Sequence, residues 1–171
     1  MAEINKTAGA KFYIGPSLVP STVNAMDEAT ALAYYEAIIT GDWTEVEGIE
    51  SFGDLGDMSQ PINFTAVKDA RVRKLKGPRD AGTMQIVVGV DELDDGQVAL
   101  VAAEKTNLNY AFKIVYADER DEGYSPTTDY FGGLVMSRQK NIGGASDVTK
   151  RTFQVAVNTE VVSDITDPTG S

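Results

Sequence analysis

The stretch RTFQVAVNTEVV, residues Arg151–Val162, alternates apolar and polar side chains. In an extended chain the two kinds of side chain fall on opposite faces. The apolar face holds Phe153, Val155, Val157 and Val161, and the polar face holds Thr152, Gln154, Asn158 and Glu160. A period of two is typical of an antiparallel strand that is buried on one side. The stretch therefore predicts a strand and favours a fold built on antiparallel sheet.

Further strands are predicted along the chain. Leu108–Tyr116 alternates in the same way, and three shorter stretches are rich in β-branched or aromatic residues. These are Ile62–Val67, Met84–Val90 and Phe131–Arg138, with weaker candidates at Phe12–Ile14 and Val46–Phe52. The Gly132–Gly133 pair predicts an irregularity in its strand, and Gly143–Gly144 predicts a hairpin turn.

Two stretches favour helix. Gln97–Lys105 consists mainly of good helix formers. Asp94 is its expected N-cap, and Gln97 stands three residues later, where a capping box requires Glu or Gln. A second, shorter helix is expected over Ala29–Ile39, after Asp27.

The length and composition favour one domain. The chain has 171 residues, of which 42% are hydrophobic, enough to bury a single core. We predict a mainly β domain, a β-sandwich or barrel-like fold with one flanking α-helix, over about residues 11–162. The small and polar ends, residues 1–9 and 163–171, are expected to be flexible arms. Trp43 is expected in the core or at a subunit interface.

Missing residue types exclude much of enzyme chemistry. The chain has no Cys and no His, so it has no disulfide, thiolate nucleophile, imidazole base or ordinary zinc site. No catalytic constellation is found among its carboxylates and hydroxyls, and we predict no enzyme activity, cofactor or metal. A calcium loop beginning at Asp91 fails because Leu93 and Ala102 occupy two ligand positions.

The charges are unevenly distributed. The net charge is −11, which disfavours binding to nucleic acids and anionic membranes. No stretch approaches the ~20 apolar residues needed to cross a bilayer, and we expect no signal peptide. From Phe12 to Val67 there are nine acids and no Lys or Arg. The next twelve residues carry six cations and one acid, Asp69; the cations are Lys68, Arg71, Arg73, Lys74, Lys76 and Arg79.

This basic segment, about residues 68–82, is expected to protrude as a loop. One interpretation is a solvated hairpin tip, since basic runs are usually solvated. Nucleic-acid binding is a poorer interpretation because no aromatic residues interleave with the cations. A third interpretation is a basic arm that docks on an acidic face of an identical neighbour, which favours head-to-tail assembly.

The order of these features resembles the major tail tube protein of long-tailed bacteriophages with non-contractile tails. The stretch Gly48–Asp54 leads to a strand, a basic excursion, a second strand, an acidic turn and a helix, and the chain closes with alternating strands. The most specific parts are the loop KGPRDAG, Lys76–Gly82, and the helix start DDGQ, Asp94–Gln97. The resemblance covers roughly Lys11–Val162.

The resemblance implies a structural virion protein. Six copies would form a ring, strands from all six would close into one inner barrel, and rings would stack into a hollow tube that conducts phage DNA. The implied partners are further copies of the chain, the tape measure, tail terminator and distal tail proteins, and DNA in transit without specific binding. The implied location is the virion tail, assembled in the host cytoplasm. We expect carboxylates to face the lumen, since they repel phosphates.

Two groups of alternatives remain open. A gene transfer agent, a contractile tail or a type VI secretion apparatus would use a related tube subunit. A calcium- or carbohydrate-binding β-sandwich module, using the Asp-rich turns, belongs to a different class of function.

Overall fold

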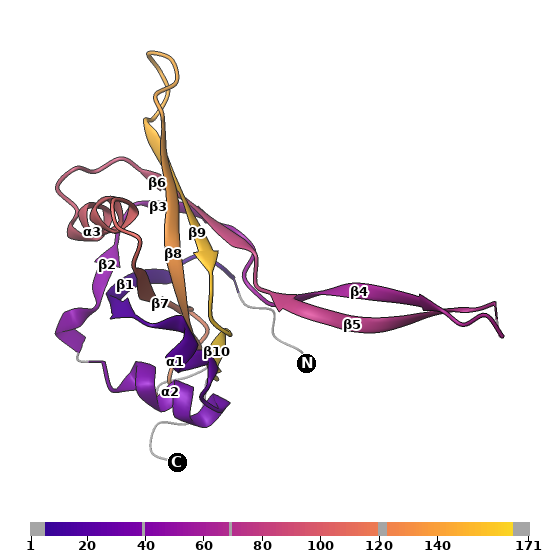
Figure 1. Cartoon of the computed structure of the whole chain (residues 1–171). Coiled ribbons are helices and arrows are strands. Elements are labelled where there is room, and N and C mark those ends of the chain that lie inside the picture. The colour runs from indigo at the N-terminus through magenta and orange to yellow at the C-terminus, as the bar shows by residue number, and fades with distance from the viewer. Residues whose placement is uncertain (1–5, 39, 69, 120–122, 166–171) are drawn as a thin grey trace.

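The structure is a computed structural model that describes residues 6–38, 40–68, 70–119 and 123–165. Its main feature is an antiparallel eight-stranded sheet with the order β2-β1-β7-β8-β9-β6-β3, in which β10 pairs with the first residues of β8 (Figure 1). The strands are β1 (Lys11–Leu18), β2 (Thr44–Val46), β3 (Ile49–Phe52), β6 (Thr83–Gly89), β7 (Asn109–Val115), β8 (Thr128–Asn141), β9 (Lys150–Val157) and β10 (Val162–Asp164).

The sheet is curled into a barrel-like shape. Its two edge strands, β2 and β3, are separated in sequence by only Glu47 and Gly48. A sheet whose edges are joined by two residues has to bend until the edges meet. Gly48 makes this turn with a φ of +74°, and its carbonyl accepts a hydrogen bond from the Gly89 N–H at the end of β6.

The main hydrophobic core fills the inside of the curl. Its largest members are phenylalanines from neighbouring strands, and the ring centroids of Phe12 and Phe112 lie 5.5 Å apart, with Phe131 5.4 Å from Phe112. Helix α3 (Asp95–Glu104) buries Leu100 and Ala103 in the same core. The alternation that predicted the strands therefore also predicted which side chains are buried.

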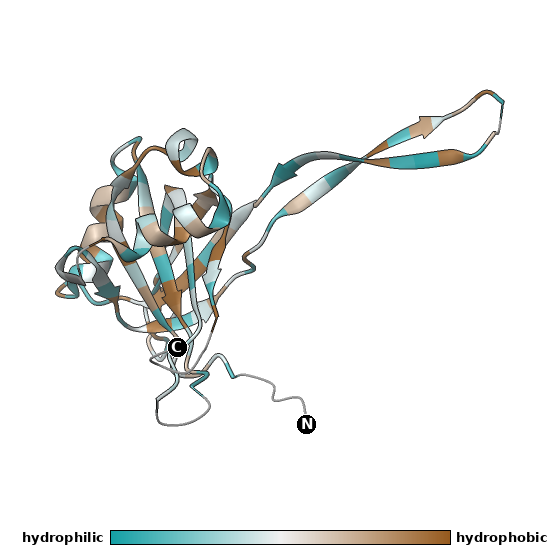
Figure 2. Ribbon diagram, turned by 90° about the horizontal axis from the view of Figure 1, so that it is seen from below, coloured by the Kyte–Doolittle hydropathy of each residue, from teal (hydrophilic) through white to brown (hydrophobic). Residues whose placement is uncertain are grey.

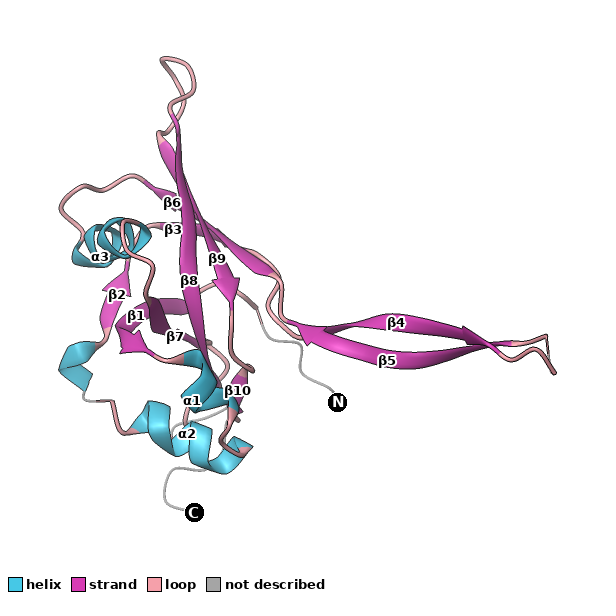
Figure 3. Cartoon of the chain, viewed as in Figure 1, coloured by secondary structure: helices cyan, strands magenta, loops and turns pink. Residues whose placement is uncertain are grey.

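A second core lies on the opposite side of β7 and β8. Here α1 (Pro20–Asn24) and α2 (Glu28–Glu36) cover the sheet, away from α3 (Figure 3). Tyr130 belongs to this core and the next residue, Phe131, to the main core, as expected for alternating strand positions. Tyr35 stacks on Tyr130 at 5.4 Å, and Trp43, just after the short 3-10 helix η1 (Thr40–Asp42), is buried beside them. The described residues thus form three α-helices: α3 and α2 overlap the two expected helices, Gln97–Lys105 and Ala29–Ile39, and α1 was not expected.

The basic segment was wrongly predicted as a loop, because most of it is strand. The strands β4 (Met58–Thr65) and β5 (Val72–Asp80) form a separate two-stranded sheet, which we call the arm, and it extends far from the body (Figure 1). Gly77 and Pro78 do not end β5, because Gln60 lies opposite both of them in a β-bulge. Gly and Pro normally interrupt a strand, and the bulge accommodates them here.

Other boundaries also differ from expectation. The strand expected over Arg151–Val162 ends at Val157, and the separate strand β10 includes Ser163 and Asp164, which were assigned to the flexible tail. The irregularity expected at Gly132–Gly133 lies at Met136. Residues 1–5 and 166–171 of the expected arms lie outside the described residues. None of the described helices is long and apolar enough to span a membrane.

Candidate assembly surfaces

The arm exposes an unusual amount of apolar surface. Of the fourteen large apolar residues that are exposed in the described part of the chain, five lie on its strands and a sixth, Val67, lies between them. The five are Met58, Ile62, Phe64, Val72 and Leu75. Exposed apolar side chains are ordinary singly, but a contiguous group indicates an interaction site. The arm carries both brown and teal segments in Figure 2, so hydrophobic and hydrophilic residues are interspersed along it.

The pairing register sorts the arm residues onto two faces. Ile62 lies opposite Leu75, and Phe64 lies opposite Arg73. Residues that lie directly opposite one another in an antiparallel pair share a face, so Ile62, Phe64, Arg73 and Leu75 form what we call the apolar face. The other face, which we call the lysine face, consists of Pro61, Asn63, Thr65, Val72, Lys74 and Lys76.

The six cations of the basic segment, all within residues 68–79, are spread along the arm. Lys68 lies at the tip, Arg71 just before β5, and Arg73, Lys74 and Lys76 within β5. Arg79 lies at the base, where its guanidinium is 3.3 Å from Glu160 and 3.9 Å from Asp57. Across the described residues no ion pair joins Lys68, Arg71, Lys74 or Lys76 to a carboxylate. These four cations can therefore meet a carboxylate of a partner, whereas Arg79 anchors the arm.

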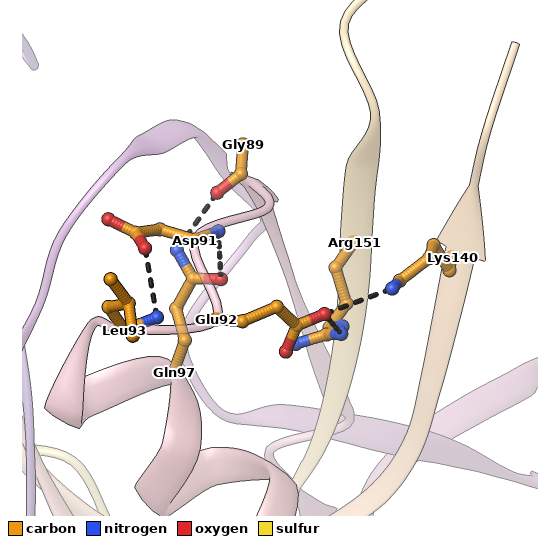
Figure 4. A network of polar contacts seen from close by, with 7 residues as sticks. All are labelled: Gly89, Asp91, Glu92, Leu93, Gln97, Lys140 and Arg151. Carbon is orange, nitrogen blue, oxygen red and sulfur yellow. Dashed lines mark hydrogen bonds and ion pairs between the residues drawn. The ribbon is translucent and has the colours of Figure 1, made fainter.

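Asp94 and Gln97 serve the fold of the body. The Asp94 carboxylate accepts a hydrogen bond of 2.8 Å from the Gln97 N–H at the start of α3. The Gln97 side chain does not return to the N-cap as a capping box requires. It is fully buried, donates to the Gly89 carbonyl (2.9 Å) and accepts from the Asp91 N–H (Figure 4). It also donates to the Glu47 carbonyl (3.1 Å). Gln97 thereby joins α3 to the connection between the edge strands β2 and β3 and to the end of β6.

A network centred on Glu92 holds the loop before α3 against the β8–β9 hairpin. The Glu92 carboxylate lies 3.0 Å from the Lys140 ammonium and 2.8 Å from the Arg151 guanidinium (Figure 4). Hydrogen bonds from Lys140 and then Arg151 hold the pKa of Glu92 below its ordinary value. This network was not predicted from the sequence. One feature of the sequence pointed to it. Arg151 stands two residues before Phe153, so its charged side chain falls on the buried face of the strand.

The Asp-rich turn gives no support to a calcium site. Asp91 accepts a hydrogen bond from the Leu93 N–H, and Asp94 accepts from the Glu47 and Gln97 N–H groups. Among the residues that the structure describes, no group of three or more His, Cys, Asp or Glu side chains could hold a metal ion. These carboxylates are used in turns and in the helix cap.

One face of the sheet carries neutral polar side chains. On β6, β9 and β8 the polar residues that share this face are Thr83, Gln85, Thr152, Gln154, Ser137 and Gln139, which we call the neutral face. The apolar residues Val87, Ala156 and Leu134 lie on the same side of these strands. Gln85 lies opposite Gln154, which in turn lies opposite Ser137. An ion pair of 2.7 Å between Lys150 and Glu50 lies at one end of this face. In a chain with 26 acids, these six neighbouring positions hold none.

No family model and no curated protein sequence matches the chain. Solved structures do match. The SPP1 tail tube has a TM-score of 0.60 and 14% identity, over 91% of this chain and 77% of that chain. A chain of the anti-feeding prophage baseplate has a TM-score of 0.64 and 11% identity, over 96% and 98%. A chain of the sheath-tube complex of an extracellular contractile injection system, PVC, has a TM-score of 0.63 and 10% identity, over 95% and 92%.

These matches span almost the whole chain and include both the curled sheet and its helices. The chain therefore has the tail tube fold. The predicted mainly β, barrel-like class is confirmed, and the predicted resemblance is confirmed at the level of fold.

Proposed function

We propose that this chain is a structural tube subunit that assembles with copies of itself into rings, and that the rings stack into a hollow tail tube. The observation that carries the proposal is the arm, a two-stranded extension with exposed apolar and cationic side chains on a body with the tail tube fold. The role is one of assembly, not catalysis.

The arm supports stacking because it is poorly suited to remaining free. A lone two-stranded hairpin is at best marginally stable in water. The arm also carries a charge of the opposite sign to the rest of the chain: residues 68–79 carry six cations and one acid, whereas the remainder carries nine cations and 25 acids. A neighbouring copy thus offers an acidic partner for a basic arm, and head-to-tail contacts of this kind build filaments.

The neutral face supports a conduit for DNA. We place it toward the lumen of a ring of six, the number that the family resemblance implies. Amide and hydroxyl side chains neither attract phosphates strongly, as Lys and Arg do, nor repel them. This proposal replaces the expectation of a carboxylate-lined lumen, because the exposed sheet face offers Gln, Ser and Thr instead.

The remaining assignments follow from the tube role. The subunit would belong to a virion tail assembled in the host cytoplasm, with a tape measure, a tail terminator and a distal tail protein as further partners. A contractile machine is the second candidate, because the fold is shared with a chain of the extracellular contractile injection system PVC as well as with the SPP1 tail tube. The tube role of this subunit is the same in either machine.

The oligomeric state tests the proposal. Purified full-length protein should form rings or tubes of uniform width in negative-stain images when it is concentrated, and its mass by light scattering should rise in steps of whole rings. A protein that stays monomeric at every concentration, and that also fails to enter particles when co-expressed with its neighbouring tail genes, would contradict it.

A further inference from the structure

The two faces of the arm differ at adjacent residues. Leu75 belongs to the apolar face with Ile62 and Phe64, whereas Lys74 points to the opposite side with Lys76. All five side chains are exposed in the isolated chain. A ribbon of this kind can bury one face against a partner while the other remains in water.

The apolar face and the lysine face contribute differently to the association of two copies. Burial of apolar surface supplies affinity that does not depend on attraction between charges. Exposed charges contribute little affinity, are screened by salt, and act mainly on the rate and orientation of encounter. Lysines on an edge ribbon also discourage pairing with the wrong strand before assembly.

We propose that the apolar face, formed by Ile62, Phe64 and Leu75 together with Arg73, is the surface that a second copy of this chain covers in the stack, and that the lysine face stays solvated. The occupant is a second copy because the arm is basic and the rest of the chain is acidic, which lets the cations guide the arm to another copy. This inference rests on the proposed function and assigns the contact surface within it. The lysines would steer assembly, and the apolar residues would hold it.

The chain contains no Cys, which allows a direct test at the two adjacent positions. Leu75→Cys and Lys74→Cys are prepared as separate variants, with Ile62→Cys as a second probe of the apolar face. Each thiol is alkylated with uncharged N-ethylmaleimide in the monomer and in the assembled protein. Assembly should slow alkylation at position 75 by at least about tenfold, as burial blocks reagent access, and at position 74 by less than about threefold.

A companion variant, Lys74→Gln with Lys76→Gln, tests the steering role. It should slow tube growth at low salt, leave the critical concentration within about threefold of the parent, and match the parent growth rate near 1 M salt, where the Debye length is about 3 Å. Failure of only the apolar-face Cys variants to assemble would also support the inference.

Three outcomes overturn the inference. Equal protection at positions 74 and 75, or stronger protection at 74, would show that the apolar face is not the contact. A critical concentration of the lysine variant more than about threefold above that of the parent would show that the lysines, and not the apolar face, supply the affinity of the contact. If the parent chain does not assemble at all, the proposed function itself is wrong, which is a result distinct from failure of this inference.

Discussion

The Arg151 guanidinium lies 2.8 Å from the Glu92 carboxylate, joining the start of β9 to the loop before α3. Arg151 is 6% exposed, so its charge is largely removed from water. One residue away, Lys150 makes a comparable pair with Glu50, but both of those side chains are well exposed. The Glu92 side chain is itself 61% exposed, so the two pairs compare an ion pair that has one buried partner with an ion pair whose two partners are both exposed.

Glu92→Ala should lower the melting temperature more than Glu50→Ala. Removal of Glu92 leaves the buried Arg151 charge without its partner, and such breakage is costly, whereas an exposed pair contributes only about 0–1 kcal/mol. Thermal unfolding followed by circular dichroism compares the two variants. Equal melting temperatures would show that Arg151 is satisfied by other groups.

The same pair predicts a pH dependence. Because the folded state lowers the pKa of Glu92 below its ordinary value of 4.5, its contribution to stability is present above about pH 4.5. That contribution is lost as the pH falls through the folded-state pKa. The stability difference between the parent and Glu92→Gln should shrink as the pH falls below 4.5. A difference that stays constant from pH 7 to pH 3 would contradict the assignment.

Gln97→Leu should destabilise the fold by about 2–4 kcal/mol. The substitution keeps the size of the side chain but leaves the Glu47 and Gly89 carbonyls and the Asp91 N–H without their buried partner. Val98→Ala, at a half-exposed position of the same helix, is the control and should change stability much less. Denaturant unfolding measures both. Comparable losses would mean that the Gln97 bonds are replaced by others.

Gly96→Ala tests the close packing of α3 on β2. A Cβ at this position would lie 2.1 Å from the Glu45 carbonyl oxygen and 2.5 Å from the Val46 Cα, both backbone atoms. We expect a loss of several kcal/mol or failure to fold, since overpacking against backbone cannot be relieved by rotamers. Gly41→Ala, where a Cβ would meet nothing within 4 Å, should fall within about 0.5 kcal/mol of the parent. Soluble yield and unfolding midpoints distinguish the two, and a stable Gly96→Ala protein would refute this packing.

The placement of the neutral face predicts how DNA behaves in the tube. The double variant Gln85→Lys and Gln154→Lys puts two cations side by side on this face, because the two residues pair across β6 and β9. Assembled tubes of this variant should retain DNA at low salt and release it as salt rises. Val98→Lys, on the exposed side of α3, adds charge elsewhere and serves as the control. If tubes of both variants retain DNA equally, the neutral face does not line the lumen.

Local patterns predicted much of the body, because buried and less buried residues alternate along β6 and β9. They do not alternate along β8, where Tyr130–Gly133 are all buried. Met84–Val90 and Leu108–Tyr116 correspond to β6 and β7 within one residue at each end. The arm was only partly predictable, since Gly77 and Pro78 normally interrupt a strand and here occupy a bulge. The two-residue connection at Gly48 and the Arg151–Glu92 pair depend on how distant segments meet, which a period of two does not encode.

The central claim is that the arm of one copy is covered by another copy in a stacked tube, and hydrogen exchange tests it most directly. Amides of β4 and β5 should exchange rapidly in the monomer, because a lone hairpin opens easily. In assembled protein they should become strongly protected, while amides of the β6–β9 pair, buried in the body, serve as the reference in both states. Strong protection of the arm only after assembly is the result that the account predicts. Equal exchange of the arm in monomer and assembly would contradict it.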